Sequence, residues 1–321
     1  MKRIHAHCAV AAALCLGSGI ATAQNYPDKP IHFVLPFGAG SSTDALARVL
    51  ATAVGEDTGQ TTIVENRPGA EGFIGVQAVR VAKSDGYTLL MSSNATHVLN
   101  AVLYKSLPYD PVKDFTPVAS LGMIPLTLNV TSNSPLTSVQ VLIETARKQP
   151  GKLTFGSATA VQRLAGELFQ QRTGIKMLNV PYKAAAASAT DLVAGQTDMM
   201  FATATTFDPQ VKAGRVRVLG VTTPIRLASM PNVPTIEQAG VPGYDFAAWF
   251  GIWLPAGAPA PIVNRLNAIL AKAMQDKRVQ NVLDIGGVVF KPMSPEAFGA
   301  YVVSEIDKFG KLVKAAGIEP T

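Results

Sequence analysis

The chain repeats one local pattern, in which a short apolar run is followed by a junction of small polar residues and then by a helical segment. The first example runs from the β-rich segment 31–37 through the junction 38–43 into a predicted helix over 44–54. Two further examples begin with predicted strands at 153–155 and 176–180. Strands that alternate with helices indicate a mostly parallel sheet flanked by helices, so the predicted fold class is α/β.

Two long apolar segments lack a helix partner. Residues 118–130 and 248–254 are broken by Pro or Gly, and we interpret them as chain crossings between two lobes, one outward and one back. This interpretation predicts a discontinuous lobe 1, formed by residues 24–124 plus 251–321, and an inserted lobe 2 over 125–250. A single domain is the alternative.

The N-terminus has the three parts of a secretory signal peptide in the right order. Lys2 and Arg3 precede a short apolar run over 8–16, and Ala21-Thr22-Ala23 is an A-x-A cleavage site. We therefore predict a signal peptide over 1–23, with cleavage before Gln24. A buried N-terminal helix is the alternative.

Export and composition limit the cofactors and partners to expect. The net charge of +6 falls to +4 when Lys2 and Arg3 are removed, and no Lys/Arg run of the kind that binds nucleic acid is present. Cys8 and Cys15 both lie in the predicted signal peptide, and Leu14 before Cys15 argues against an acylated anchor. We expect a periplasmic monomer with no membrane anchor, disulfide, metal or cofactor after cleavage.

Motifs of catalysis are missing from the sequence. After the predicted cleavage the histidines are His32 and His97, and neither H-x-x-x-H, H-E-x-x-H nor G-x-S-x-G occurs. Gly38-x-Gly40 resembles part of a phosphate loop, but Thr43 stands where the third glycine of a dinucleotide fingerprint would be. The sequence therefore favours a binding protein. An enzyme is the alternative.

Four junctions are candidates for a binding site: residues 38–43, 92–94, 156–159 and 182–184. Ligands of open α/β sheets bind beyond the carboxyl ends of strands, and the unpaired N–H groups of a helix start attract anions. If both lobes point these ends at one cleft, a dicarboxylate can be held at both of its ends. The alternative is that these Ser, Thr and Asn residues only cap helices.

The candidate ligand-binding residues lie in or beside the junctions. His97 can face the cleft or cover its helix, and Phe37 can contact a ligand or pack in the core. Arg163 can reach a ligand carboxylate or lie on the surface. The full set is Phe37, Gly38, Gly40, Ser41, Ser42, Thr43, Ser92, Asn94, His97, Ser157, Thr159, Arg163, Tyr182 and Thr203.

At these residues the sequence resembles the Bug family, the extracytoplasmic solute receptors (TctC-like) of tripartite tricarboxylate transporters. The resemblance covers nearly all of the predicted mature chain. It is carried by Tyr26-Pro-Asp-Lys-Pro-Ile31, Pro36-Phe37-x-x-Gly40-x-x-x-Asp44, Val64-Glu-Asn-Arg-Pro-Gly-Ala70, Asp85-Gly-Tyr-Thr-Leu-Leu90, Tyr109-Asp-Pro-x-x-Asp-Phe115, Val180-Pro-Tyr-Lys183, Asp191-Leu-x-x-Gly-Gln196, Val233-Pro-Thr235 and Pro255-Ala-Gly257.

The resemblance implies a two-lobe, flytrap-like periplasmic binding protein of type II. Such a receptor closes on a small organic anion, here a mono- or dicarboxylate, and delivers it to membrane transporter subunits. Backbone groups and bridging waters grip the carboxylate at the first junction in that family. A protein that signals to a membrane sensor kinase needs the same cleft and is the alternative function.

Three positions depart from the family pattern. Ser41 replaces a usual Gly, Ala184 replaces another, and Arg163 stands in the place of a usual His after a shortened stretch over 158–161. Each change adds a side chain or removes backbone freedom beside the expected pocket. We therefore expect the ligand to differ from the usual one and give Arg163 more weight in binding.

Overall fold

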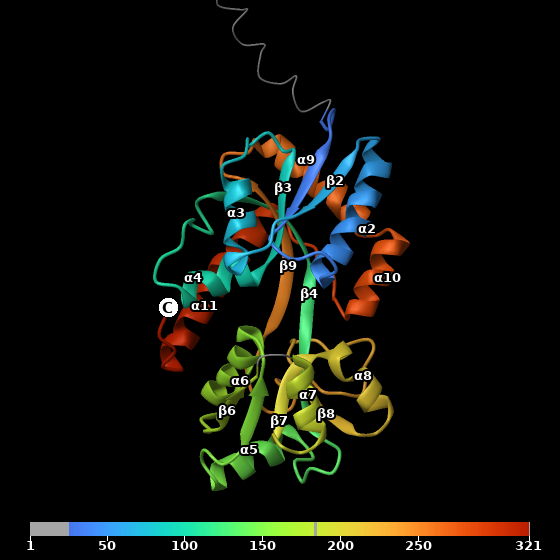
Figure 1. Ribbon diagram of the computed structural model, residues 1–321. Helices are drawn as coiled ribbons and strands as arrows, with labels where there is room; N and C mark the ends of the chain where they lie inside the picture. Colours follow the sequence, from blue (N-terminus) through green and yellow to red (C-terminus); the bar gives the residue numbers. More distant parts are fainter. Residues whose placement is uncertain (1–25, 183–184, 321) are drawn as a thin grey trace, which may run out of the picture.

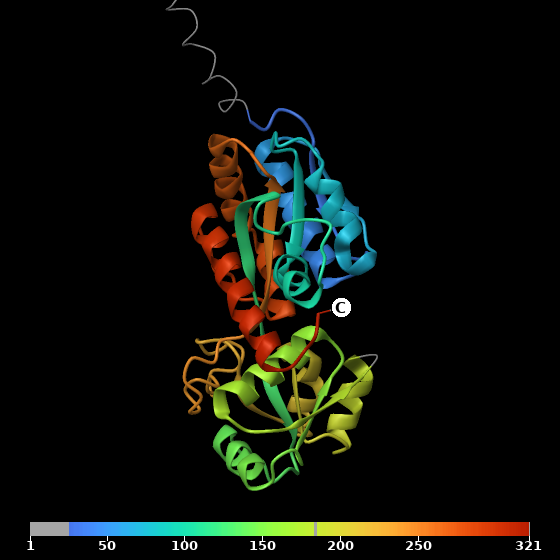
Figure 2. The same cartoon turned by 90° about the vertical axis from the view of Figure 1, so that its left-hand side faces the viewer.

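The computed structural model describes residues 26–182 and 185–320. The predicted signal peptide, residues 1–23, lies outside the described residues, as do Lys183 and Ala184 of the fourth junction. Figures 1 and 2 show two bodies, one above the other, that are joined by two long strands. We call the upper body lobe 1 and the lower body lobe 2.

Three parallel strands form the centre of lobe 1. They are β1 (Ile31–Leu35), β2 (Thr62–Asn66) and β3 (Thr88–Ser93), and β1 pairs with both of the others. Alternate residues of β1 are fully buried, and Val34 on its other face is 3% exposed. A strand buried on both faces has a largely apolar sequence, and residues 31–35 are apolar except for the half-buried His32.

Helices from both ends of the described chain cover lobe 1. Figures 1 and 2 show the C-terminal helices, drawn in orange and red, beside helices from the first third of the chain. They are α2 (Ser42–Thr58), α3 (Phe73–Arg80), α4 (Asn100–Leu103), α9 (Ala260–Ala273), α10 (Lys277–Gly286) and α11 (Pro295–Ala315), with a 3-10 turn η1 (Ala70–Gly72) and a π-helical turn η2 (Ala95–Leu99).

The two segments interpreted as crossings are the strands β4 (Phe115–Thr131) and β9 (Ala247–Pro255). They pair antiparallel over residues 115–125 of β4, which continues in lobe 2 by pairing with β7 (Met199–Thr203) and β8 (Val216–Val221). With β5 (Thr154–Ser157) and β6 (Leu178–Pro181), one sheet runs through both lobes in the order β2-β1-β3-β9-β4-β7-β5-β6. The predicted boundaries at 124/125 and 250/251 fall within these strands and stay a prediction.

Lobe 2 repeats the arrangement with its own parallel strands. β5 pairs parallel with β6 and β7, and β8 pairs antiparallel with β4. The elements are α5 (Val139–Lys148), β5 (Thr154–Ser157), α6 (Ala160–Thr173), β6 (Leu178–Pro181), α7 (Ala185–Val193), β7 (Met199–Thr203), α8 (Ala204–Lys212) and β8 (Val216–Val221).

The crossing is packed by aromatic side chains beneath α11. Trp249 and Trp253 of β9 are each 1% exposed, and both contact the ring of Phe298. Gly251 lies between them, and a Cβ there would stand 2.2 Å from Phe298 Cζ. The missing side chain lets α11 approach the strand, while Trp249 Nε1 donates to the buried carboxylate of Glu305 at 3.3 Å.

Candidate ligand-binding site

The two lobes direct the carboxyl ends of their parallel strands toward each other. Figure 1 shows β1 running down from the top of lobe 1 and β5 running up from the bottom of lobe 2. The helices that follow these strands, α2 and α6, therefore both begin on the sides where the lobes face each other. This is the arrangement in which helix starts from both lobes can contact one ligand.

The first junction leads into α2 through a side-chain cap. Ser41 Oγ accepts the N–H of Asp44 at 3.2 Å, and Gly40 adopts a positive φ of 80°. Gly38 and Gly40 are exposed and Phe37 is half-buried, whereas Thr43 is buried. The N–H groups of the first helical turn have no acceptor within the helix, so this end of α2 can receive an anion.

Asp44 holds the first junction in shape. Its carboxylate accepts Gly40 N–H at 2.9 Å, Asn66 Nδ2 at 3.0 Å and Arg48 Nε at 3.1 Å. The hydrogen bond from Arg48, followed by the one from Gly40, lowers the pKa of this carboxyl. Because Asp44 is 4% exposed and fully engaged, its role here is structural.

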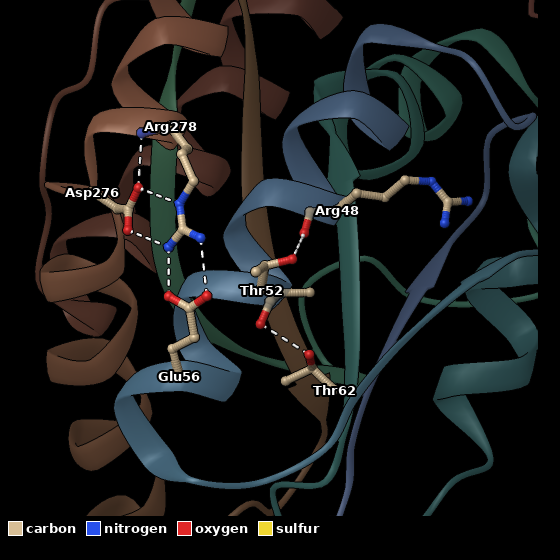
Figure 3. Close-up of polar contacts among 7 residues, drawn as sticks. Arg48, Thr52, Glu56, Thr62, Asp276 and Arg278 are labelled. Atoms are coloured by element: carbon tan, nitrogen blue, oxygen red, sulfur yellow. Dashed lines mark hydrogen bonds and ion pairs between the residues drawn. The ribbon is translucent and has the colours of Figure 1, made fainter.

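The helix that carries this junction is tied to α10. Figure 3 shows the guanidinium of Arg278 between Glu56 at the far end of α2 and Asp276. Arg278 donates to Glu56 at 2.9 and 2.6 Å and to Asp276 at 3.0 and 2.7 Å. These contacts lower the pKa of both carboxyls, that of Asp276 to about 2. Lys272 of α9 also pairs with Asp57.

The second junction is buried in the core of lobe 1. Ser92 is fully buried and its hydroxyl lies 2.7 Å from that of Thr96. Asn94 is 1% exposed, and its Nδ2 donates to the carbonyl of Ala247 at the start of β9 at 3.4 Å. These predicted residues therefore connect β3 to the crossing strands and do not reach the facing surfaces of the lobes.

His97 also lies in this core. Its ring is fully buried and stacks on Trp253 with centroids 3.8 Å apart, and Nδ1 lies 2.9 Å from Thr96 Oγ1. Burial lowers the pKa of His97 to about 3, so the ring is neutral near pH 7. Its Nε2 has no hydrogen-bond partner among the described residues. His97 thus packs in the core of lobe 1, and a contact between His97 and a ligand stays a prediction.

The third junction and Tyr182 of the fourth line a pocket of about 310 Å³, which we call the lobe-2 pocket. It brings together four of the predicted residues: Ser157, Thr159, Arg163 and Tyr182. Ser157 Oγ donates to Asn179 Oδ1 at 2.7 Å, and Thr159 caps α6. The other lining residues are Leu103, Ala158, Ala160, Leu164, Asn179, Pro181 and Ile318.

Arg163 gives this pocket its positive charge. Its side chain is 44% exposed, and its nearest carboxylate, that of Glu167, lies 3.9 Å from Nε. That separation is an ion pair without a hydrogen bond. Burial raises the pKa of Glu167, and Arg163 partly opposes this effect. The guanidinium therefore has donors available for a planar anion such as a carboxylate.

Thr203, the last residue of β7, does not line the lobe-2 pocket. It lines a separate pocket of about 230 Å³ between the lobes, which we call the hinge-side pocket. The lining residues are Ala45, Leu46, Ile124, Thr203, Thr205, Phe250, Val282, Leu283, Ile285, Gly286 and Val288. The predicted candidates are thus distributed over the first junction, the buried second junction and two pockets.

Several lining residues were not predicted from the sequence. Leu103 and Ile318 come from lobe 1 and the C-terminal segment, so only the tertiary fold brings them to the lobe-2 pocket. Asn179 follows Leu178 in an exposed strand, where the alternation of polar and apolar residues is the only available signal. No cluster of metal-ligating side chains and no helix long and apolar enough to cross a membrane occurs among residues 26–182 and 185–320.

Two α/β lobes joined by a pair of antiparallel strands, with helix starts and pockets between them, define a two-lobe solute-binding protein. A model of the family described as "Tripartite tricarboxylate transporter family receptor" matches residues 46–318. The chain belongs to this family, and the resemblance drawn from its motifs is confirmed.

Individual proteins extend this result. The chain is 32% identical to protein BugT of Bordetella pertussis, over 92% of each chain. It is similar to the structure of R. palustris Rpa4515 with adipate, with 36% identity, a TM-score of 0.74 and coverage of 92% of this chain and all of that one. It is also similar to MatC from Rhodopseudomonas palustris with bound malate, with 29% identity, a TM-score of 0.70 and coverage of 90% and 100%.

Proposed function

We propose that the protein is an extracytoplasmic solute receptor that binds a small organic carboxylate between its lobes and delivers it to a tripartite tricarboxylate-type transporter. The observation that carries this proposal is the lobe-2 pocket, where Arg163 and the start of α6 lie beside Leu103 and Ile318, which come from outside lobe 2. Both similar structures named above hold a dicarboxylate, adipate or malate.

The binding residues we propose are a subset of the sequence candidates. The first junction, 38–43, would supply backbone N–H groups from lobe 1. Thr159, Arg163 and Tyr182 would contact the ligand from lobe 2, with Ser157 holding Asn179 in place. A ligand touching both lobes stabilises the closed arrangement, because the open form cannot make both sets of contacts.

A thermal-shift screen tests the carboxylate class. Adipate and malate should raise the midpoint of unfolding, since a ligand that binds the folded state stabilises it by mass action. Glucose and lysine serve as a neutral and a cationic comparison. A shift with glucose or lysine and none with any acid would contradict the proposal. Mass spectrometry of the incubated acids should find them unchanged, as a receptor without turnover requires.

Two matched variants locate the site. Ser41→Glu places a negative charge at the start of α2, and Ser138→Glu makes the same change at the N-cap of α5, where Ser138 Oγ accepts an N–H at the same 3.2 Å. Both lose a cap worth about 1 kcal/mol. We expect S41E to lose carboxylate binding and S138E to keep it. Equal carboxylate affinities of S41E and S138E would mean that the site does not lie at the first junction.

In its cellular setting, we propose that the receptor is periplasmic and acts as a monomer. The support is its family membership together with the predicted signal peptide over 1–23. Fractionation of cells that express the full chain should place it in the periplasm, shortened by 23 residues. Full-length protein in the cytoplasm would contradict the prediction. Size-exclusion chromatography with light scattering tests the monomer.

A further inference from the structure

The hinge-side pocket differs in chemistry from the lobe-2 pocket. Among the described residues, Thr203 and Thr205 are its only polar lining side chains, whereas Ser157, Asn179 and Arg163 line the other pocket. Its walls come from α2 and α10 of lobe 1, from the crossing strands and from the start of α8 in lobe 2. The space between the lobes thus has a charged side and an apolar side.

The apolar side begins next to the first junction. Ala45 lines the hinge-side pocket, and its N–H donates to the carbonyl of Ser41 at 3.0 Å. Residues four apart lie on the same face of a helix, and one turn rises about 5.4 Å. A carboxylate held at the start of α2 therefore has the pocket within reach of a short hydrocarbon chain.

The polar atoms on the lobe-2 wall of the hinge-side pocket do not need a hydrogen bond from a ligand. The hydroxyl of Thr203 lies 2.9 Å from that of Thr206 and 3.3 Å from that of Thr205. The polar atoms on this wall thus already have partners. An apolar ligand group could therefore cover these hydroxyls without breaking a hydrogen bond.

The lobe-1 side exposes apolar surface at the mouth of the pocket. Ile285 of α10 is 69% exposed and Val282 is half-buried, while Phe250 at the back is only 5% exposed. Covering such surface with hydrocarbon is favourable by about 25 cal/mol per Å². A ligand body in the pocket would contact Ile285 and reduce the exposure of its side chain.

We infer that the hinge-side pocket binds the hydrocarbon body of the ligand, so that the preferred solute is a carboxylate with an alkyl or aryl group of about six carbons. The inference rests on the proposed function, because it places the carboxylate at the first junction. A dry apolar cavity of roughly 150 Å³ can hold benzene, so a pocket of about 230 Å³ has room for such a group. Since both lobes line the pocket, the bound body also favours lobe closure.

Calorimetric titration of a homologous series tests the inference. Butanoate, hexanoate, benzoate and malate are compared on the full chain. Each buried methylene is worth about 0.8 kcal/mol, which corresponds to about fourfold in affinity. Hexanoate should therefore bind about fifteenfold more tightly than butanoate, and benzoate should bind more tightly than malate.

Two variants and a control assign the effect to the pocket. Ala45→Phe fills it from an exposed helix position, and Ile285→Asp puts a charge at its mouth. Val81→Asp is the control, because Val81 is 77% exposed and does not line the pocket. Circular dichroism verifies folding. Both pocket variants should lose the preference for hexanoate over butanoate, whereas V81D should keep it.

The possible results separate this inference from the proposed function. If acids bind with no dependence on chain length, the inference is overturned and the carboxylate receptor stands. If chain length matters but A45F and I285D leave it unchanged, the body binds elsewhere and the inference is again wrong. If hexanol binds and no acid does, the proposed function fails together with the position of the carboxylate.

Discussion

Two glycines in helix interiors should respond to the same substitution with opposite signs. Gly166 lies within α6 and Gly310 within α11. A Cβ on Gly310 would find its nearest atom at an ordinary 3.8 Å, in Val102. A Cβ on Gly166 would stand 2.4, 2.8 and 2.9 Å from three ring atoms of Phe155, which is fully buried in β5.

These distances set the expected magnitudes. Replacing Gly by Ala inside a helix favours folding by about 0.5–1 kcal/mol, and G310A should gain that amount. Overpacking a core costs about 1–3 kcal/mol. For G166A the cost exceeds the helix gain, so the net loss should be about 1–2 kcal/mol. At about 2 °C per kcal/mol for a chain of this length, G310A should melt 1–2 °C higher and G166A 2–4 °C lower.

Urea titration and thermal melts of the two variants, side by side with the parent protein, provide the measurement. G166A should also weaken carboxylate binding, because α6 carries Thr159 and Arg163 into the lobe-2 pocket. G310A should bind normally. If G166A proves as stable as G310A, the close packing of α6 on Phe155 is not real and the reasoning fails.

Four further perturbations follow from the described contacts. Asp44→Ala should lower the free energy of unfolding near pH 7. Because the pKa of Asp44 is lowered in the folded state, its stabilising contribution is present above the unfolded pKa and is lost as the pH falls through the folded pKa. The urea midpoints of parent and variant should therefore converge in acid, and a gap that persists there refutes the role. His97→Gln should reduce the loss of stability on acidification. The unfolded chain binds a proton at His97 below about pH 6.5, whereas the buried ring stays neutral down to a pKa of about 3. An unchanged pH dependence of the free energy of unfolding argues against that burial. Arg278→Ala should lower the melting midpoint slightly, and 1 M salt should shrink the difference; a loss insensitive to salt would mean that Arg278 acts by packing. Arg163→Gln should weaken adipate binding about tenfold or more by calorimetry without changing the melting midpoint of the free protein, and unaltered affinity would remove Arg163 from the site.

The positions of the strands could be predicted from the sequence, because their apolar runs are short and bounded by turn residues. The run at 31–37 contains the strand β1, and the predicted helix over 44–54 lies within α2. Three helices, α5, α8 and α10, were not predicted. α8 contains Pro209 and has two threonines in its first turn, so its local sequence does not favour a helix. Its buried Phe207 packs with the neighbouring β7 and β8.

The site was predictable only as far as local sequence determines it. The caps at Ser41 and Thr159 are local features and are present as helix caps. Ser92 and Asn94 belong to a junction of the same small polar residue types, but they are buried. The reason is that β3 is an inner strand that pairs with β9, and the turn after β3 packs under α11. Leu103, Ile318 and Ile124 are distant in sequence from the pockets they line, so no local pattern could have identified them.

A crystal structure with a bound acid tests the central claim most directly. The acid would be whichever member of the carboxylate series raises the melting midpoint most. We predict that its carboxylate lies within hydrogen-bonding distance of backbone N–H groups in residues 38–43 and that the same molecule also contacts residues of lobe 2. Density for the acid on an outer surface, or against one lobe alone, would contradict the account.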